Sequence, residues 1–525
     1  MSLVEVDGLT VEFGDLRAVD TLSFRLEEGA ALGVVGESGS GKSTVASALL
    51  GLHRGTGARV TGSVRVAGTD VQEADDDALR RLRGGTAAMV FQDPLSSLDP
   101  YYAVGDQIAE VYRVHSGASR RAARARAVDV LDRVGIPDAA RRARSRPHEF
   151  SGGMRQRALI AMALACEPAL LVADEPTTAL DVTVQAQILD LLHSLRQETG
   201  MGLLLVTHDV GVAAESVDDV LVMRHGRAVE RGTVADVLGA PSAAYTKELL
   251  GAVPRVDAAR PVRADAAGDV LLEATDLRRE FGRGKRAFAA VDGVSLTVRS
   301  GETLGIVGES GSGKTTLGRM LVGLLEPTGG QVLLSGKRAD AGVQMVFQDP
   351  VSSLNPRRSV GESVADPLRA RGDKEVRGRV EELLERVGLD PAHYGRYPHE
   401  FSGGQRQRVG IARALAAEPR IIVCDEPVSA LDVTTQAQVT GLLRELQDEL
   451  GLALVFIAHD LAVVRQVSDR VAVMRKGRVV ECGTVDEVYG APQDPYTRQL
   501  LAAVPALDPG VAARRRSTRR ELAAA

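Results

Sequence analysis

Two glycine-rich segments of the chain carry a lysine and a hydroxyl residue at a spacing that binds phosphate chains. The pattern GxxxxGK followed by serine or threonine runs from Gly36 to Ser43 and again from Gly308 to Thr315. Each copy follows an apolar run typical of a strand and precedes a run typical of a helix, as a phosphate-binding loop requires. The glycines let backbone N–H groups turn toward phosphates, and the lysine reaches the outer phosphates. The sequence therefore predicts two nucleotide sites, with Ser43 and Thr315 supplying hydroxyl groups to Mg²⁺.

A pair of acidic residues follows an apolar run in each half of the chain. LLVADE ends in Asp174 and Glu175, and IIVCDE ends in Asp425 and Glu426. Phosphoryl transfer depends on positioning and electrostatics more than on covalent chemistry. We therefore expect Asp174 and Asp425 to serve the metal, and Glu175 and Glu426 to act as catalytic bases that polarise the attacking water.

The two sites belong to two copies of one long sequence. PHEFSGGMRQR at residues 147–157 matches PHEFSGGQRQR at residues 398–408, and ADEPTTALDVTVQAQI at 173–188 matches CDEPVSALDVTTQAQV at 424–439. A repeat of this length in a chain of 525 residues indicates two domains. The predicted boundaries are a first domain over residues 1–253, a linker over 254–269, a second domain over 270–505 and a tail over 506–525.

The linker and the tail are predicted from composition. Residues 253–269 are rich in proline, alanine and charge without an apolar period. The tail contains five arginines: Arg514, Arg515, Arg516, Arg519 and Arg520. A charge run of this kind predicts a solvated, disordered end, with contact to membrane headgroups as the alternative.

Short apolar runs alternate with helical patterns in each copy, which predicts α/β domains with crossover helices. Residues 32–35 are expected to form the strand that enters the first glycine loop. Residues 120–134 and 374–387 place apolar side chains at helical spacing among many charges, which predicts a mostly helical subdomain in each half. Strand patterns return at residues 170–173 and 421–424.

Composition excludes several classes of protein. The net charge of −6, with 44% hydrophobic and 26% charged residues, excludes disorder throughout and a polytopic membrane protein, and disfavours nucleic-acid binding. The first residues lack the basic and apolar regions of a secretory signal, so we expect the chain to stay in the cytoplasm. Cys166, Cys424 and Cys482 have no metal-type spacing, and we expect them to be reduced, packed thiols.

A serine and two glycines between the phosphate-binding loop and the acidic pair of each half indicate which class of ATPase the chain resembles. Ser151, Gly152 and Gly153, and again Ser402, Gly403 and Gly404, stand in FSGGM and FSGGQ. The chain thereby resembles ATP-binding cassette (ABC) ATPases, whose signature is LSGGQ. The resemblance covers nearly the whole chain and implies two tandem P-loop domains. Each would have a RecA-like core sheet, an antiparallel β subdomain and an inserted helical subdomain. It also implies an intramolecular cassette dimer, in which the signature of one cassette closes over ATP held by the other.

Further roles follow from the resemblance. Gln92 and Gln348 would sense the metal and the transport partner, and His208 and His459 would be catalytic switch histidines. Each histidine follows its glutamate by 33 residues. Asp181 and Asp432 would lie in the ALD loops and belong to the ATP-binding set.

The adenine ring is expected to stack on an aromatic residue in each cassette. The resemblance points to Phe13 and Phe281, with Phe288 as a competitor in the second half. Met154 replaces the signature glutamine that Gln405 keeps, and we still predict two active sites. The complete set expected to contact ATP in the two loops is Gly36, Glu37, Ser38, Gly39, Ser40, Gly41, Lys42, Ser43, Thr44, Gly308, Glu309, Ser310, Gly311, Ser312, Gly313, Lys314, Thr315 and Thr316.

Four further segments resemble one importer group. FQDPLSSLDP and FQDPVSSLNP, with AYTKELLGAVP and PYTRQLLAAVP at the ends of the cassettes, are similar to ATPases of dipeptide, oligopeptide and nickel importers. The first cassette resembles the D-type and the second the F-type, so the chain would be a fusion of two subunits. This implies a peripheral protein on the cytoplasmic side of the cell membrane. Its partners would be two integral-membrane permeases, met by the segments after Gln92 and Gln348, and indirectly an extracytoplasmic binding protein.

Alternatives remain open at this point. The ATPase of an exporter would use the same chemistry. A soluble twin-cassette protein acting on the ribosome or on DNA is disfavoured by the short linker and by the lack of zinc-type cysteine pairs. The resemblance implies that a cysteine-rich segment after the AVP stretch could hold an iron–sulfur cluster. Neither 253–269 nor 504–525 contains a cysteine, so we expect no such cluster. A peptide, a nickel chelate or a glycoside could be the cargo.

Overall fold

The computed structural model describes residues 2–178, 180–258, 268–282, 287–338, 342–429 and 431–524. The chain divides into two units. Unit 1 comprises Met1–Leu180, Val184–Val253 and Pro505–Ala525, and unit 2 comprises Asp181–Thr183 and Pro254–Val504. The predicted linker falls partly outside the described residues, because 259–267 are not among them.

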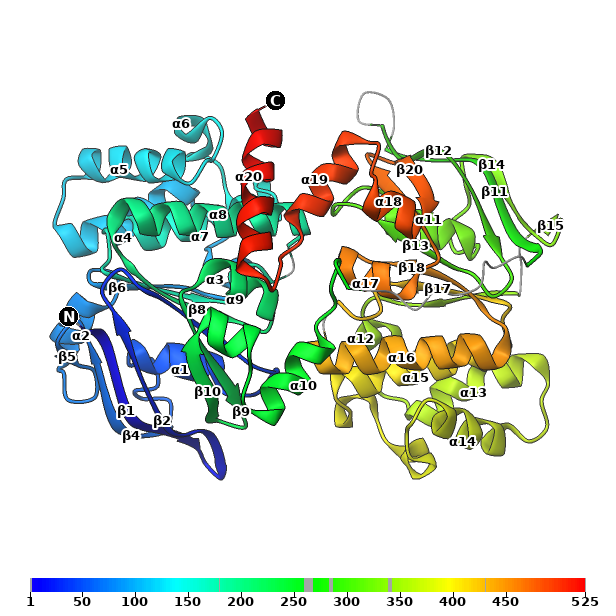
Figure 1. The fold of residues 1–525 in the computed structure, drawn as a ribbon, viewed down its shortest axis with the longest axis horizontal. Coiled ribbons are helices and arrows are strands. Elements are labelled where there is room, and N and C mark those ends of the chain that lie inside the picture. Colours follow the sequence, from blue (N-terminus) through cyan, green and yellow to red (C-terminus); the bar gives the residue numbers. More distant parts are fainter. Residues whose placement is uncertain are drawn as a thin grey trace. The chain divides into compact units, whose positions relative to one another are not determined.

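The central sheet of unit 1 has six strands in the order β10-β9-β3-β8-β7-β6, and only β9 and β10 pair antiparallel (Figure 1). Its strands are β3 (Ala31–Val35), β6 (Ala87–Val90), β7 (Leu170–Asp174), β8 (Gly202–Thr207), β9 (Asp219–Arg224) and β10 (Arg227–Thr233). Every residue of β3, β7 and β8 is buried, because parallel strands are covered on both faces. A second, antiparallel sheet consists of β1 (Ser2–Phe13), β2 (Leu16–Glu27), β4 (Arg59–Val66) and β5 (Thr69–Asp70).

Unit 1 has three layers. Leu32 and Val34 of β3 belong to the core shared with the antiparallel sheet, whereas Ala31 and Val35 belong to the core shared with the helices. The helices are α1 (Lys42–Leu49), α2 (Asp76–Leu82), α3 (Pro94–Ser97), α4 (Val104–Ser116), α5 (Arg120–Arg133), α6 (Ala139–Arg142), α7 (Gly152–Leu164), α8 (Val182–Thr199), α9 (Val210–Ser216), α10 (Ala244–Ala252) and α20 (Pro509–Ala524). Helix α5 confirms the helix predicted over 120–134.

Unit 2 repeats this architecture. Its central sheet has the order β16-β17-β18-β13-β19-β20, and its antiparallel sheet has the order β12-β11-β14-β15. The strands are β11 (Val270–Phe281), β12 (Phe288–Arg299), β13 (Thr303–Val307), β14 (Gly329–Leu334), β15 (Lys337–Arg338), β16 (Val343–Val346), β17 (Ile421–Asp425), β18 (Ala453–Ile457), β19 (Arg470–Arg475) and β20 (Arg478–Thr484). The helices are α11 (Lys314–Leu321), α12 (Pro350–Ser353), α13 (Val360–Arg371), α14 (Val376–Arg386), α15 (Gly403–Leu415), α16 (Val433–Leu450), α17 (Leu461–Val467), α18 (Val485–Gly490) and α19 (Pro495–Ala503). Both units confirm the expected α/β class.

The prediction of a disordered tail is wrong. Residues Pro509–Ala524 form α20, which packs on α8 and α9 of unit 1 (Figure 1). The guanidinium of Arg519 donates to the carboxylates of Asp190 and Glu215 at 2.9 and 2.5 Å, and Arg516 donates to the backbone carbonyl of Glu215 at 2.6 Å. The sequence does not indicate this pairing, because the counter-charges of the arginine run lie about 300 residues away along the chain.

Two other expectations concern the packing of the cysteines and the absence of membrane-spanning helices. Cys424 is buried and Cys166 half-buried, but Cys482 is exposed rather than packed. None of the helices in the described ranges has both the length and the apolar run needed to cross a membrane.

Candidate active sites

The first phosphate-binding loop joins β3 to α1. Its glycines adopt backbone angles that side chains disfavour, with φ of 155° at Gly36, 78° at Gly39 and 97° at Gly41. A Cβ on Gly36 would collide with the carbonyl oxygen of Met223, and one on Gly41 with that of Ala18. Gly36 and Gly41 of the motif are thus required because backbone from other segments lies too close to leave room for a side chain.

The lysine of each loop lies beneath its own loop. Lys42 is 5% exposed, and its Nζ donates to the carbonyls of Gly36 and Glu37, both at 2.8 Å. Lys314 makes the same two bonds in unit 2, at 2.7 and 2.9 Å. Burial lowers the pKa of Lys314, while nearby acidic groups oppose this. Both ammonium groups are therefore held inside the loop, where the phosphates of a bound nucleotide would lie.

A buried serine hydroxyl inside each loop has unused hydrogen-bonding capacity. The Oγ atoms of Ser40 and Ser312 have no hydrogen-bond partner among the described residues, and each side chain is 5% exposed. A buried polar group without a partner is costly, so a ligand oxygen is expected here. Together with the lysine and the helix N-terminus, these hydroxyls fit a polyphosphate.

Two of the three predicted metal residues meet in each unit, whereas the third, Gln92 or Gln348, bonds the neighbouring glutamate. Ser43 Oγ donates to Asp174 Oδ1 at 3.0 Å, and Thr315 Oγ1 donates to Asp425 Oδ1 at 3.0 Å. Burial raises the pKa of both aspartates, and the hydroxyl bonds partly offset this. A hydroxyl and a carboxylate are oxygen ligands of the kind that Mg²⁺ prefers, so the residues fit that ion.

Glu175 follows β7 in a strained conformation, with φ of 47°. Its backbone N–H donates to the carbonyl of Val206 at 2.9 Å. Its carboxylate lies 3.1 Å from Nδ1 of His208 and accepts from Gln92 Nε2 and Thr178 Oγ1, both at 2.9 Å. The turn thus presents the carboxylate to a histidine, an amide and a hydroxyl.

The second unit reproduces this cluster with one change. Glu426 has φ of 46°, and its carboxylate lies 3.4 Å from His459 Nδ1 and accepts from Gln348 Nε2 at 2.7 Å. Ser429 stands where Thr178 stands in unit 1, and its hydroxyl donates to the backbone carbonyl of Glu426 at 3.1 Å. The hydroxyl at this position therefore bonds the carboxylate of the glutamate in unit 1 but the backbone carbonyl of the glutamate in unit 2.

In each cluster the glutamate and the histidine shift each other's pKa. Burial pushes the pKa of Glu175 and Glu426 upward, but the bond to the histidine and its charge lower the pKa below its ordinary value. The bond to Glu175 raises the pKa of His208, and burial opposes this. At His459 burial is the largest effect and lowers the pKa, but the bond to Glu426 and the charges of Glu426 and Asp460 together raise the pKa above its ordinary value. An ionised carboxylate at this place can accept a proton from a water.

The signature serines cap the helices that follow them. Ser151 Oγ accepts from the N–H of Met154 at 3.4 Å, and Ser402 Oγ accepts from that of Gln405 at 3.3 Å. Gln405 Oε1 also accepts from the N–H of Ser402 at 2.9 Å, which completes a capping box. Met154 has no oxygen with which to do this, so the box is incomplete in the first cassette.

The ALD aspartates lie at the start of the next helix. Asp432 caps α16 by accepting from the N–H of Thr435 at 2.9 Å. Thr183 Oγ1 lies 2.7 Å from Asp181 Oδ1 and 2.8 Å from Glu309 Oε1, so the two carboxylates share its single hydrogen. Asp181 and Thr183 both belong to unit 2.

The predicted aromatic residues lie at the ends of strands. Phe13 ends β1, is 38% exposed and contacts the ring of His53 edge-on at 5.5 Å. In unit 2, Phe281 and Phe288 form a cross-strand pair and stack at 5.8 Å, so both remain candidates. Phe288 is 61% exposed.

Two contacts of the clusters were missed from the sequence. Thr178 bonds the carboxylate of Glu175, and the hydroxyl of Tyr496 bonds the backbone of Glu309. The available signals were the threonine inside DEPTT and the tyrosine of PYTRQLL, which the resemblance used only for classification.

Comparison with known families gives two matches, each in two places. A model described as ABC transporter matches residues 19–178 and 291–429. A model described as oligopeptide/dipeptide transporter, C-terminal region, matches residues 229–279 and 480–524.

Individual relatives were also found. The chain is 46% identical to the glutathione import ATP-binding protein GsiA of Salmonella paratyphi A, over 97% of this chain and 90% of the relative. It is 45% identical to GsiA of Escherichia coli K12 with the same coverage. Among solved structures, cbiO1 of Clostridium perfringens, part of the ABC transporter complex cbiONQ, is 32% identical. The match covers 42% of this chain and 92% of that one, with a TM-score of 0.39.

Proposed function

Because the chain belongs to the ABC transporter family, we propose that it docks on the cytoplasmic side of a membrane importer and energises uptake of a small peptide-type solute. The chain is an ATPase of the importer type, with two cassettes in one polypeptide. The observation that carries the proposal is the combination of two complete catalytic clusters with the paired C-terminal regions named for peptide transporters.

The proposed cargo is supported by the relatives. Proteins 45–46% identical over 97% of the chain are named for glutathione import, and the C-terminal model is named for oligopeptides and dipeptides. Both names describe small peptides, which favours this class over a nickel chelate or a glycoside.

The proposed chemistry assigns one task to each residue of a cluster. The loop amides and Lys42 bind the phosphates of ATP, and Ser43, Asp174 and Gln92 would hold Mg²⁺. Bound Mg²⁺ would neutralise phosphate charge during transfer. Glu175 takes a proton from the attacking water, and His208 holds the carboxylate of Glu175 in place. Lys314, Thr315, Asp425, Gln348, Glu426 and His459 would do the same in the second cassette.

We further propose that each signature helix completes the site of the other cassette. The N-termini of α7 and α15 present backbone N–H groups and glycines, which together can bind an anion. Helix α7 would close over ATP bound at the second phosphate-binding loop, and helix α15 would close over ATP bound at the first. Both sites are proposed to hydrolyse ATP.

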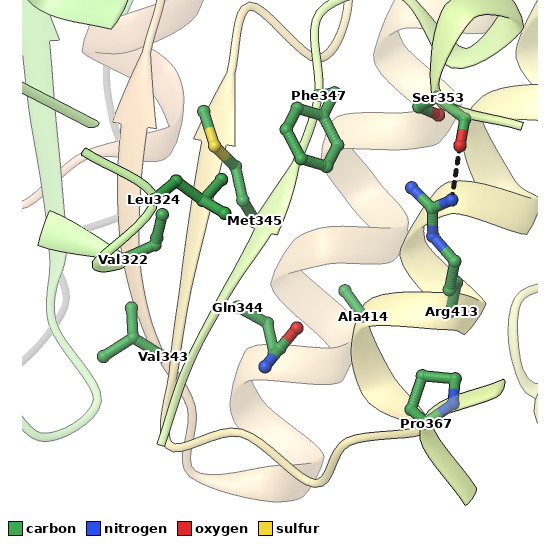
Figure 2. A pocket seen from close by; sticks show the side chains of 10 residues that line it. All are labelled: Val322, Leu324, Val343, Gln344, Met345, Phe347, Ser353, Pro367, Arg413 and Ala414. Atoms are coloured by element: carbon green, nitrogen blue, oxygen red, sulfur yellow. Dashed lines mark hydrogen bonds between the residues drawn. The ribbon is translucent and has the colours of Figure 1, made fainter. Parts of the chain in front are cut away.

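Surface residues near the glutamines support permease docking. A cavity of about 500 Å³ in unit 2 is lined by Met345, Phe347 and Leu324 on one side and by Arg413 on another (Figure 2). Arg413 donates to the backbone carbonyl of Ser353 at 2.6 Å, which fixes the wall. Since Phe347 directly precedes Gln348, an apolar segment of a permease bound here would act next to the catalytic cluster.

The matching segment of unit 1 carries exposed aromatic side chains. Phe91, Tyr101 and Tyr102 are 45%, 80% and 63% exposed. Large apolar side chains gathered on a surface mark an interaction site. We propose that the second permease covers them.

Co-purification tests this function. The tagged chain, isolated from gently solubilised membranes of its host, is expected to carry two integral-membrane permeases identified by mass spectrometry. A Tyr101→Ser/Tyr102→Ser chain should lose the permease that binds unit 1, whereas the matched Val114→Ser chain, altered at a side chain 63% exposed on α4, should keep it. Recovery of ribosomal proteins, or of no membrane protein, would contradict the proposal.

A further inference from the structure

A tyrosine of the second C-terminal segment contacts the phosphate-binding loop of unit 2. Tyr496 lies in the first turn of α19, and its hydroxyl oxygen accepts a hydrogen bond from the backbone N–H of Glu309 at 3.0 Å. The side chain is 2% exposed and is among the largest fully buried ones in the described chain. The two residues are 187 positions apart, so the tertiary fold brings them together.

Glu309 is also held from within the loop. Its carbonyl accepts from Lys314 Nζ at 2.9 Å, and the same ammonium bonds the carbonyl of Gly308 at 2.7 Å. Gly308 has φ of 152° and passes so close to the carbonyl of Met474 that a Cβ would collide with it. The start of the loop is thus fixed on both sides of Glu309. From outside the loop, Tyr496 contacts the backbone N–H of Glu309, and Thr183 contacts its carboxylate.

The position of Tyr496 is itself well determined. Asp494 caps α19 by accepting from the N–H of Tyr496 at 2.8 Å, and the guanidinium of Arg475 lies 4.7 Å from the ring centroid. Burial raises the pKa of Tyr496 to about 12, so the hydroxyl stays neutral near pH 7. Unit 1 repeats the packing, with Arg224 4.5 Å from the ring of Tyr245.

We propose that Tyr496 is a positioning residue for ATP binding, which holds the second phosphate-binding loop in the conformation that receives the phosphates. This gives the C-terminal region a task at the nucleotide site, beyond the function proposed above, and it rests on ATP binding to the second loop. A site whose competent conformation is populated only in part binds with an affinity reduced by that fraction. Loss of one hydrogen bond should then weaken ATP binding about 2- to 10-fold.

Binding of mant-ATP with Mg²⁺ to the full chain tests the proposal. A Lys42→Ala parent removes the lysine of the first loop, so that the fluorescence reports the second loop. In this parent, Tyr496→Phe removes only the hydroxyl and is expected to raise the Kd about 2- to 10-fold. The matched control is Tyr489→Phe, which removes another buried hydroxyl of unit 2, bonded to the carbonyl of Leu461 at 2.7 Å, and should leave the Kd unchanged.

Kinetics separate positioning from a purely structural role. With Lys42 intact, Tyr496→Phe should raise the KM for ATP at the second site and leave kcat unchanged, because the contacts of Glu426 and His459 are untouched. An unchanged Kd with a lowered unfolding temperature, or an equal loss of affinity in Tyr489→Phe, would overturn the proposal. Failure of the Lys42→Ala parent itself to bind mant-ATP would contradict nucleotide binding at the second site, and the proposal with it.

Discussion

Replacing Arg519 by alanine is expected to destabilise unit 1, although the residue lies at the end of the second cassette in sequence. The guanidinium donates twice to Asp190, at 3.1 and 2.9 Å, and once to Glu215 at 2.5 Å. The side chain of Arg519 is 10% exposed and that of Glu215 is 3% exposed. The substitution therefore leaves a buried carboxylate without its main counter-charge.

The magnitude follows from this burial. Removing one partner of a buried ion pair costs about 3–5 kcal/mol, and the contact of Arg516 with the same region favours the lower end. The loss cannot exceed the free energy of docking α20, because the helix can detach and let water reach Glu215. For a domain of this size each kcal/mol moves the unfolding midpoint by about 2–4 °C, so about 3 kcal/mol lowers it by roughly 6–12 °C.

The effect should also depend on pH. Burial raises the pKa of Glu215, and Arg519 opposes this. A carboxyl whose folded pKa is raised stabilises the fold while it is protonated and loses that contribution as the pH rises through the folded pKa. Without Arg519 the pKa rises further, so the deficit of the variant should be largest near neutral pH and shrink in acid.

Differential scanning calorimetry of the full chain measures this prediction. The control is Arg520→Ala, which removes an exposed arginine from the next position of the same helix and should leave the midpoint nearly unchanged. Since a buried pair can often be replaced by uncharged residues at little cost, Glu215→Gln/Arg519→Met should recover most of the stability. Equal midpoints for Arg519→Ala and Arg520→Ala would refute the reasoning.

Three further predictions concern the catalytic clusters. Glu175→Gln should lower the phosphate release of the purified chain substantially, and Glu175→Gln/Glu426→Gln should abolish it; full activity of the single variant would contradict the role given to Glu175. Because the pKa of His208 is raised, its pair with Glu175 stabilises the fold below about pH 6.5 and loses that contribution as the pH rises through the folded pKa. His208→Gln should therefore lower the unfolding midpoint more in acid than in alkali. A loss of stability that does not change with pH would count against this pairing. Met154→Gln should complete the capping box of Ser151 and raise the midpoint of unit 1 by an amount equivalent to about 0.5–1 kcal/mol, and no gain would show that the box is not formed.

The sequence by itself determined the phosphate-binding loops, the duplication and the class of fold. These features depend on residues that are close together in the chain. Gly36 and Gly41 are needed for a turn only a few residues long, and Lys42 begins the helix that follows. Continuous apolar runs such as residues 170–173 identify strands buried on both faces, so the α/β order could be predicted without tertiary information.

The tertiary structure decided which groups share a charge or a hydrogen bond across long separations. Arginines at residues 514–520 look like a solvated run in sequence, yet Arg519 is buried because α8 and α9 supply two carboxylates. Tyr496 looked like part of a family-specific ending, and only its distance to Glu309 indicates a role at the nucleotide loop. The physical reason is that burial and pairing depend on neighbours in space, and for these side chains the neighbours are hundreds of residues away in the sequence.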